Sequence, residues 1–251
     1  MAKLNGFIKL EGTLDNLTFY KGKEGYLVRT KGGISKERMK NDPAFQRTRE
    51  NGSEFGRAGI GGKLVRNAIR ILLLNAKDKL VTSRLTTDLL KVVKSDLVNE
   101  RGMRTIQDGS MSLLSGFEFN INAKLGSTLF AAYTNTFDRV SGEATVNIPS
   151  FSPLVRIAAP SGTTHYKIVT GSSELDFANE TFTFESDETA ILPYDSADTG
   201  IVDFVCALTP NSTLPVIQVL GVEFYQEVNG QMYPLKNGSF NALAIVNIDT
   251  V

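Results

Sequence analysis

The period of the hydrophobic pattern changes near Asp108, and this change constrains the fold more than any other feature of the sequence. Before Asp108, apolar residues recur about every 3.6 residues, as they do along one face of a helix. After it, Phe117, Phe119 and Ile121 alternate with polar residues, which is the period of a half-buried strand. A run of helices followed by many strands is typical of an α+β protein.

Before the helical segment, the first forty residues predict a small β-meander. Short apolar segments are separated by glycines, and their apolar residues are Phe7, Ile8 and Leu10, then Leu17 and Phe19, then Tyr26 and Val28. Lys21–Gly25 is the clearest turn. We therefore expect a β-meander over residues 1–40, a helical region over 41–108 and a β-sandwich domain over 109–251.

The helical region is expected to form a short helical hairpin or bundle. Asp42-Pro43 predicts a helix start, because the carboxylate can accept hydrogen bonds from free N–H groups and proline suits the first helical position. The glycines at 59, 61 and 62 predict a break in this first helix. Further helices are expected from Lys63 to about Asp78 and from about Ser83 to Asn99.

The predicted helix from Lys63 to Asp78 has two distinct faces. Its apolar face carries Val65, Ala68, Ile69, Leu72 and Ala76. The opposite face is a basic stripe of Lys63, Arg66, Arg70 and Lys77. Three further apolar residues, Ile71, Leu73 and Leu74, fall outside the main apolar face. Apolar residues on several sides of a helix require burial on several sides. We therefore expect the four basic residues and these three further apolar residues to contact another copy or an anionic partner.

The C-terminal half predicts an immunoglobulin-like antiparallel β-sandwich. Its expected strands are short and separated by turn residues, at 128–133, 143–148, 164–170, 181–185, 202–208, 216–228, 231–235 and 243–248. Asn229-Gly230 between two of them is a strong hairpin signal, because a type I′ turn needs positive φ at both central positions.

Four segments carry a resemblance to known families. They are LEGTLDNLTFYKGKEGYLVRTKGG, NDPAFQRTRENGSEFGRA, PSGTTHYKIVTG and LGVEFYQEVNG. Together they resemble uncharacterised bacterial domain-of-unknown-function families, which place a β-hairpin, a proline-started helix and a C-terminal β-sandwich in this order. DPAFQRTR is also similar to segments of phage-like virion proteins. The resemblance implies this order of elements and brings no activity with it.

The neutral net charge conceals two oppositely charged halves. Residues 1–110 carry 22 Lys and Arg against 12 Asp and Glu, a net charge of +10. Residues 111–251 carry 5 against 15, a net charge of −10. Such asymmetry suggests a partner for each half, and another copy of the chain would serve both. Two independently solvated domains of unequal composition are the simpler alternative.

The motifs that carry chemistry do not favour an enzyme. The glycine-rich segment Gly56–Lys63 departs from both phosphate-binding templates, since Arg57 and Leu64 occupy required positions. The sequence holds one histidine, His165, and no G-x-S-x-G motif. The single cysteine, Cys206, is expected to be a buried core thiol. We therefore predict no catalytic residue, no metal site and no cofactor.

Acidic residues in two predicted loop regions leave Ca²⁺ binding open. They are Glu185, Asp187 and Glu188, and Asp195, Asp198 and Asp203. They lack the dense D-x-D-x-D-G spacing of a dedicated calcium loop, and solvated turns are the alternative.

Two functions from different classes remain. The first is a non-enzymatic, self-assembling structural subunit of virion, tail or filament type, in which the basic half of one copy contacts the acidic half of the next. The second is a binding module, whose sandwich loops hold a ligand while the basic helix contacts nucleic acid or another anionic partner. The sequence shows neither a transmembrane segment nor a signal peptide, so we expect a cytoplasmic protein or a part of a virion-like or other assembled particle.

Overall fold

The computed structural model describes residues 2–4, 6, 8–30 and 33–250, and it is a mixed α+β protein with antiparallel sheets, as the sequence predicts. Internal contacts divide the chain into two compact units, Met1–Arg49 (unit 1) and Glu50–Val251 (unit 2). The predicted helical region is therefore shared between the units, and most of it belongs with the β-rich part.

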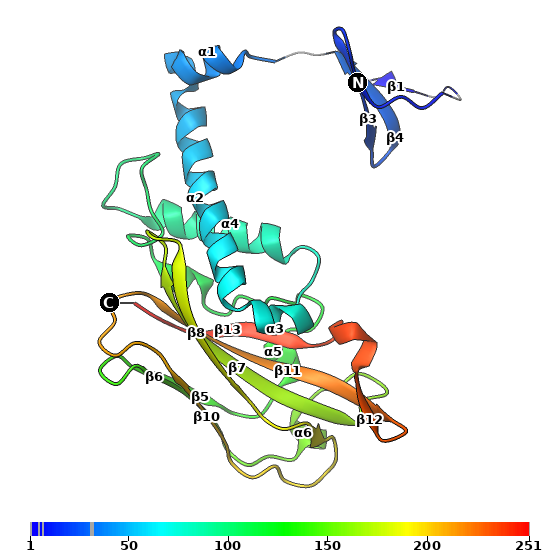
Figure 1. Cartoon of the computed structure of the whole chain (residues 1–251), viewed down its shortest axis with the longest axis vertical. Helices are drawn as coiled ribbons and strands as arrows, with labels where there is room; N and C mark the ends of the chain where they lie inside the picture. The colour runs from blue at the N-terminus through cyan, green and yellow to red at the C-terminus, as the bar shows by residue number, and fades with distance from the viewer. Residues whose placement is uncertain (1, 5, 7, 31–32, 251) are drawn as a thin grey trace. The chain divides into compact units, whose positions relative to one another are not determined.

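Unit 1 contains a four-stranded antiparallel sheet in the order β1-β4-β3-β2 (Figure 1). Its elements are β1 (Ala2–Lys3), β2 (Gly12–Leu14), β3 (Leu17–Gly22), β4 (Gly25–Thr30), α1 (Lys36–Asn41) and a 3₁₀ turn (Pro43–Phe45). The predicted turn joins β3 to β4, while Ile8 and Leu10 lie outside the strands and Phe7 lies outside the described residues. Asp42 begins the 3₁₀ turn as predicted, because its Oδ1 accepts a 2.9 Å hydrogen bond from the Ala44 N–H.

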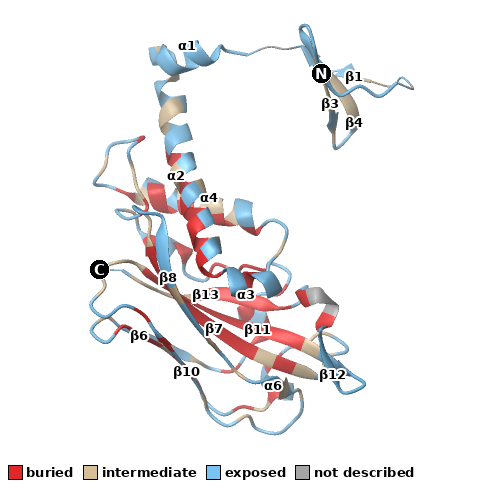
Figure 2. Cartoon of the chain, viewed as in Figure 1, coloured by how far each residue is buried: buried red, intermediate tan, exposed pale blue. Residues whose placement is uncertain are grey.

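Among the described side chains of unit 1, every one is exposed or half-buried (Figure 2). A sheet of this size usually gains stability by burying an apolar face against a second layer. Unit 1 provides no such layer from its described residues.

Helix α2 (Gln46–Ala68) carries residues of both units and is continuous, so the predicted break at its glycines is wrong. Gly61 and Gly62 are buried in this helix. A Cβ atom on Gly61 would lie 2.2 Å from Ile106 Cδ1, and one on Gly62 would lie 3.4 Å from Thr86 Oγ1. These glycines allow close packing against α2, which a sequence pattern cannot distinguish from a helix break.

The predicted helix from Lys63 to Asp78 is divided at Ile69 between the end of α2 and α3 (Arg70–Asn75). The apolar face is confirmed, because Val65, Ala68, Ile69, Leu72 and Ala76 are all buried.

Helix α4 (Val81–Ser95) ends earlier than the predicted Asn99, because Asp96 leaves the helical conformation and is buried. Its carboxylate accepts hydrogen bonds from Val98 N, Asn99 N, Asn99 Nδ2 and Thr105 N. These bonds hold the loop that follows the helix.

The strands of unit 2 form two antiparallel sheets and include a half-barrel. In the central sheet, β11 (Val216–Val228) pairs with β7 (His165–Asp176) on one side and with β12 (Gln231–Pro234) and β13 (Ala242–Asp249) on the other, while β8 (Thr181–Glu188) and β9 (Leu192–Pro193) pair with β7. The outer sheet has the order β10-β6-β5, with β5 (Thr134–Asp138), β6 (Glu143–Ile148) and β10 (Val202–Ala207). Short helical turns, namely Met111–Leu114, α5 (Leu125–Thr128), α6 (Pro153–Arg156) and Leu235–Gly238, connect the strands.

The central sheet of unit 2 is buried on both faces (Figures 1 and 2). One face packs against α2, α3 and α4 and carries Val169, Leu175, Ile217, Val219, Leu243 and Ile245. The other face packs against the outer sheet and carries Tyr166, Ile168, Leu220, Val222 and Phe224. Burial on both faces explains why the sequence of β11 is apolar almost without interruption.

Most strands in unit 2 occur where the sequence predicts them. The expected bounds of β6 and β11 are confirmed, and Asn229 and Gly230 have φ angles of 52° and 76°, as their hairpin turn requires. The strand expected around Phe117–Ile121 is reduced to a single antiparallel bridge between Glu118 and Ala244 of β13. At this bridge the Phe119 N–H donates to Leu243 O at 2.8 Å, and the alternation places Phe117 and Phe119 in the core.

Candidate functional site

The turn that joins α2, α3 and α4 contains a surface groove of about 430 Å³, which we call the helix-turn groove. Its lining residues are Arg66, Asn67, Arg70, Leu73, Leu74, Lys77, Asp78, Lys79, Val81 and Thr82. Arg66, Arg70 and Lys77 of the predicted basic stripe therefore line one groove, and Lys79 is a fourth basic residue there. Lys63, the remaining residue of the stripe, is not among the lining residues. The period of the helix brings Arg66 and Arg70 together, and the end of α3 adds Lys77 and Lys79.

Arg66 is held rigidly at one side of the groove. Its Nε donates to Gly62 O at 2.9 Å, and its Nη1 donates to Thr82 Oγ1 at 2.8 Å. Arg70, Lys77 and Lys79 are exposed, and within the described part of the chain no hydrogen bond or ion pair engages their side chains. They are therefore the cations of the groove that are available to a partner.

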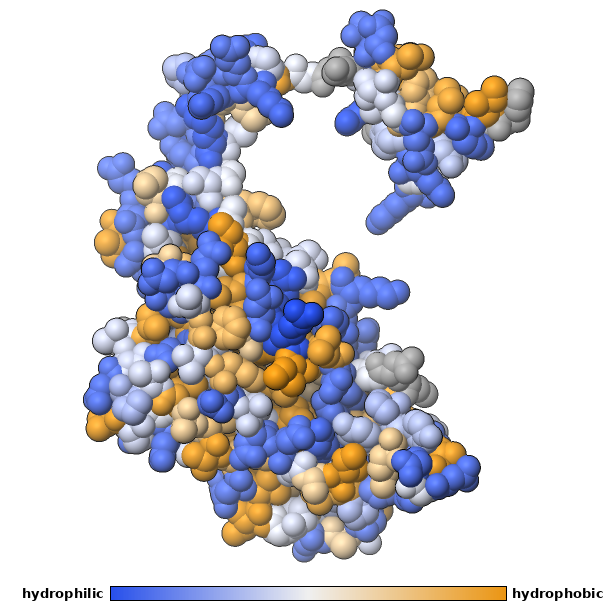
Figure 3. Space-filling model, viewed as in Figure 1, coloured by the Kyte–Doolittle hydropathy of each residue, from blue (hydrophilic) through white to orange (hydrophobic). Residues whose placement is uncertain are grey.

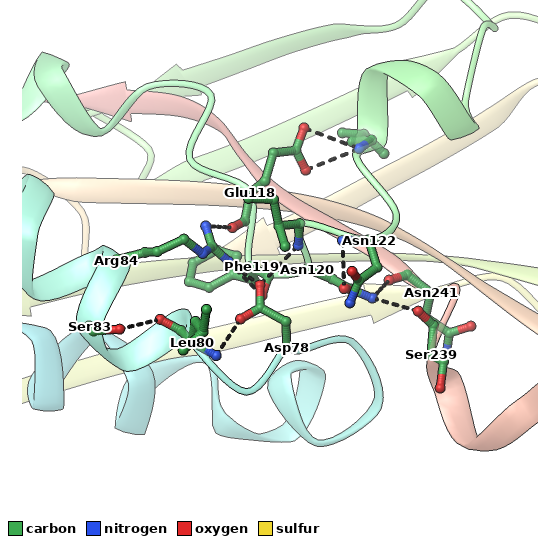
Figure 4. A network of polar contacts seen from close by, with 12 residues as sticks. Asp78, Leu80, Ser83, Arg84, Glu118, Phe119, Asn120, Asn122, Ser239 and Asn241 are labelled. Atoms are coloured by element: carbon green, nitrogen blue, oxygen red, sulfur yellow. Dashed lines mark hydrogen bonds and ion pairs between the residues drawn. The ribbon is translucent and has the colours of Figure 1, made fainter. Parts of the chain in front are cut away.

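The single acidic residue of the groove, Asp78, is already neutralised (Figure 4). It forms an ion pair with Arg84 and accepts hydrogen bonds from Leu80 N at 2.6 Å and Ile121 N at 2.9 Å. Burial opposes its ionisation, but these hydrogen bonds and the Arg84 charge prevail and hold the pKa of Asp78 below its usual range. The groove consequently presents an excess of positive charge.

Exposed apolar side chains lie beside these cations. Ile71, Leu74 and Leu80 are 66%, 62% and 63% exposed. Leu73, which we expected to share this surface, is buried at 5% exposure and belongs to the core beneath the groove. The helical period placed both Leu73 and Leu74 outside the main apolar face, so it could not show that one is buried and the other exposed.

A second polar cluster, which the sequence analysis missed, surrounds the buried carboxylate of Glu223 on β11. Asn75 Nδ2 donates to its Oε1 at 2.9 Å, and the Tyr225 hydroxyl donates to its Oε2 at 2.6 Å. Lys167 lies 3.8 Å from Oε2 and forms a closer ion pair of 2.8 Å with Glu188. Burial and the Glu223 carboxylate both raise the pKa of Tyr225, which keeps this hydroxyl protonated as a donor.

This Glu223 cluster borders a small pocket of about 180 Å³ lined by Leu74, Asn75, Pro234, Gly238 and Asn241 as well as by Glu223 and Tyr225. Each carboxylate oxygen of Glu223 already has a partner, so the cluster connects α3 to the central sheet. The one signal in the sequence was a glutamate inside the apolar run of β11.

The other residues considered in the sequence analysis lie apart from one another. The glycines of Gly56–Lys63 are inside α2, so they do not form a phosphate-binding loop. His165 Nδ1 is 2.9 Å from Thr164 Oγ1 at the start of β7. Cys206 is buried as predicted, and burial raises the pKa of its thiol.

Among the described residues, no group of three or more His, Cys, Asp or Glu side chains is placed to hold a metal ion. None of the described helices has both the length and the hydropathy that crossing a membrane requires. Comparison of the chain with protein-family models, with curated proteins and with solved structures gave no match.

Proposed function

We propose that this protein is a non-enzymatic structural subunit that assembles with copies of itself. The observation that carries the proposal is the helix-turn groove, which places the free cations Arg70, Lys77 and Lys79 beside exposed Leu74. Charged and apolar groups in one hollow suit a protein surface that offers carboxylates around an apolar contact.

The charge of the two units supports another copy as the partner. Unit 1 has 11 Lys and Arg against 5 Asp and Glu, and unit 2 has 16 against 22. The chain therefore offers acidic surface to the groove of a neighbour. Contacts between unlike surfaces of identical copies produce rings or open filaments, which fits a virion, tail or filament subunit.

Two finer assignments belong to the same proposal. Two antiparallel sheets that pack face to face in unit 2 support an immunoglobulin-like sandwich. The order of hairpin, proline-started helix and β-rich part supports kinship with the uncharacterised bacterial families that the sequence resembles.

The proposal is tested by measuring mass with light scattering over a range of protein concentrations. We expect oligomers at about 0.1 M salt that dissociate at about 1 M salt, because the Debye length falls from about 10 Å to about 3 Å. A wild-type protein that stays monomeric at every concentration in low salt would remove the proposal.

Charge reversal within the groove tests its part in assembly. Arg70→Glu with Lys77→Glu should abolish the oligomers, while the matched control Lys94→Glu with Lys124→Glu makes the same change of charge on exposed residues elsewhere in unit 2 and should assemble normally. Arg66 is left unchanged because its hydrogen bonds support the fold. Equal assembly of both double variants would exclude the groove as the interface.

The four basic residues around one groove also favour a second candidate, a module that binds nucleic acid through phosphate contacts. This candidate predicts that the protein stays monomeric and slows the migration of an oligonucleotide in a gel at low salt. It also predicts that Arg70→Glu with Lys77→Glu abolishes this shift. Assembly without retardation favours the structural subunit.

A further inference from the structure

One face of the unit 1 sheet carries Leu14, Leu17, Phe19, Tyr26 and Val28, which we call the sheet-face cluster, together with Lys21 beside Tyr26. Strand register places them together, since Leu14 is opposite Leu17, and Phe19 is opposite Val28. Side chains alternate between the faces of a strand, so Thr18, Tyr20 and Leu27 occupy the opposite face. Figure 3 shows hydrophobic residues on the surface of unit 1.

The described residues of unit 1 cover the sheet-face cluster only in part, since Phe19, Tyr26 and Val28 are half-buried. Leu14 is 69% exposed and Leu17 is 43% exposed. A shallow hollow of about 630 Å³, lined in part by Ala2, Leu17 and Val28, lies on this face. An apolar sheet face of this kind is a surface for another layer.

The positive charge of unit 1 indicates what kind of protein surface would cover the sheet-face cluster. Unit 1 has a net charge of +6, and Lys9 and Lys21 lie 5.3 Å and 5.9 Å from the ring centre of Tyr26 in the cluster. The covering surface should therefore be flat, partly apolar and acidic. Packing two copies of this face together would instead bring two units of +6 into contact.

The outer sheet of unit 2 has a face with these properties. Its outward positions include Thr136, Thr145 and Val205, and Val205 is 53% exposed. Asp138, Glu143 and Asp203 add three carboxylates on this side, and the strands β5, β6 and β10 contain no Lys or Arg.

We propose that the sheet-face cluster of one copy packs onto the outward face of the outer sheet of a second copy. This inference rests on the proposed function and names a second pair of surfaces for it. Face-to-face packing of two sheets at about 10 Å separation would bury Phe19 and Val28 of one copy against Val205 of the other. The two surfaces differ, so the contact is heterologous and leaves the pair with one free surface of each kind.

The size of the cluster indicates that this contact needs support from another. Two strands of six residues and one of three, about 4.8 Å apart and rising about 3.3 Å per residue, cover roughly 240 Å². A standard stable interface buries about 800 Å² on each partner. The sheet contact should therefore act together with the helix-turn groove in assembly.

Complementation between two defective variants tests the proposal. Phe19→Asp damages the sheet-face cluster, and Val205→Lys damages the outward face of the outer sheet. Each variant alone should be monomeric where the wild type assembles. An equimolar mixture contains one intact surface of each kind and should form a complex of two chains and nothing larger, as measured by light scattering.

Matched controls separate the contact from damage to the fold. Thr18→Asp places the same charge on the opposite face of β3, and Thr183→Lys places a lysine on an exposed position of β8, so both should assemble like the wild type. Leu14→Asp repeats the test at a side chain of the cluster that is 69% exposed and therefore contributes little to the packing of unit 1.

The outcomes distinguish this inference from the proposed function. Wild-type assembly that persists in both Phe19→Asp and Val205→Lys, or a mixture that remains monomeric, would overturn the sheet contact and leave self-assembly standing. Loss of assembly in Phe19→Asp with full assembly in Val205→Lys would overturn it in favour of two sheet-face clusters packing together. A monomeric wild type would remove both proposals.

Discussion

Single residues in this protein fix loops that the hydrophobic pattern leaves undefined, and Asp96 is the clearest example. Its buried carboxylate accepts four hydrogen bonds from the segment that follows α4. Burial would raise its pKa, but the hydrogen bonds from Asn99, Thr105 and Val98 prevail and lower it well below its usual range. The carboxylate therefore stabilises the folded state in its ionised form.

Replacing Asp96 with alanine should lower the free energy of unfolding by about 2 to 4 kcal/mol, because four half-buried N–H donors lose their charged acceptor. The control Asp88→Ala removes a carboxylate of α4 that is paired only with nearby Lys91, and it should cost less than about 0.5 kcal/mol. Urea denaturation measures both. Equal losses in the two variants would contradict the importance of the Asp96 hydrogen bonds.

The contribution of Asp96 should also depend on pH in a defined direction. Its pKa is lower in the folded protein than the value of about 3.9 in the unfolded chain. The stabilisation is therefore complete above about pH 4 and declines as the pH falls toward the folded-state pKa. The difference in unfolding free energy between wild type and Asp96→Ala should be constant from about pH 7 to pH 5 and shrink below pH 4.

At the scale of elements, α2 shows that glycines of one helix have different roles. A Cβ atom on Gly56 would meet no atom within 4 Å beyond its own helix, whereas one on Gly61 would lie 2.2 Å from Ile106. Glycine lowers helix stability relative to alanine wherever no close contact requires it.

Gly56→Ala should therefore raise the free energy of unfolding by about 0.5 to 1 kcal/mol. Gly61→Ala should lower it by about 1 to 3 kcal/mol, because the added methyl group forces buried Ile106 to move. Thermal or urea denaturation of the two variants measures the opposite signs. Stabilisation by both substitutions would show that α2 does not pack as closely as the structure indicates.

The elements that the sequence predicted well are those whose stability is local. The strand Val216–Val228 is bounded by Pro215 and by Asn229-Gly230, and its turn residues define its end without any other part of the chain. The loop around Phe117 and the glycines of α2 depend on tertiary contacts instead, so their patterns were misleading.

The residues of the candidate site also divide into those that a local sequence pattern predicts and those that it does not. Arg66 and Arg70 followed from the helical period, while Lys79 and Leu80 lie in the turn after α3, where no period applies. The Glu223 cluster joins Asn75 to a residue 148 positions away, which no local pattern can reveal.

At the scale of the whole molecule, the central sheet needs the helices as well as the outer sheet. Val169, Ile217, Val219, Leu243 and Ile245 are buried in the cluster that includes the helices. Burial of one such side chain contributes about 1.5 to 3 kcal/mol, so exposing five of them costs roughly 10 kcal/mol. This equals the entire stability of an ordinary domain.

A fragment of residues 50–251 should therefore fold and unfold cooperatively. A fragment of residues 109–251 should aggregate or lack a cooperative transition, because it has lost α2, α3 and α4. Circular dichroism during heating, with gel filtration, distinguishes the two. Cooperative unfolding of a monomeric 109–251 fragment would restore the domain boundary that the sequence suggested at residue 108.

The buried thiol of Cys206 provides a natural probe for opening of the core of unit 2. It is the single cysteine of the chain, it is 2% exposed, and its raised pKa keeps the unreactive protonated form. A thiol reagent can modify it only when the two sheets of unit 2 separate far enough to admit the reagent. The rate at which the native protein is labelled thus measures how often this part of the core opens, and no probe has to be introduced.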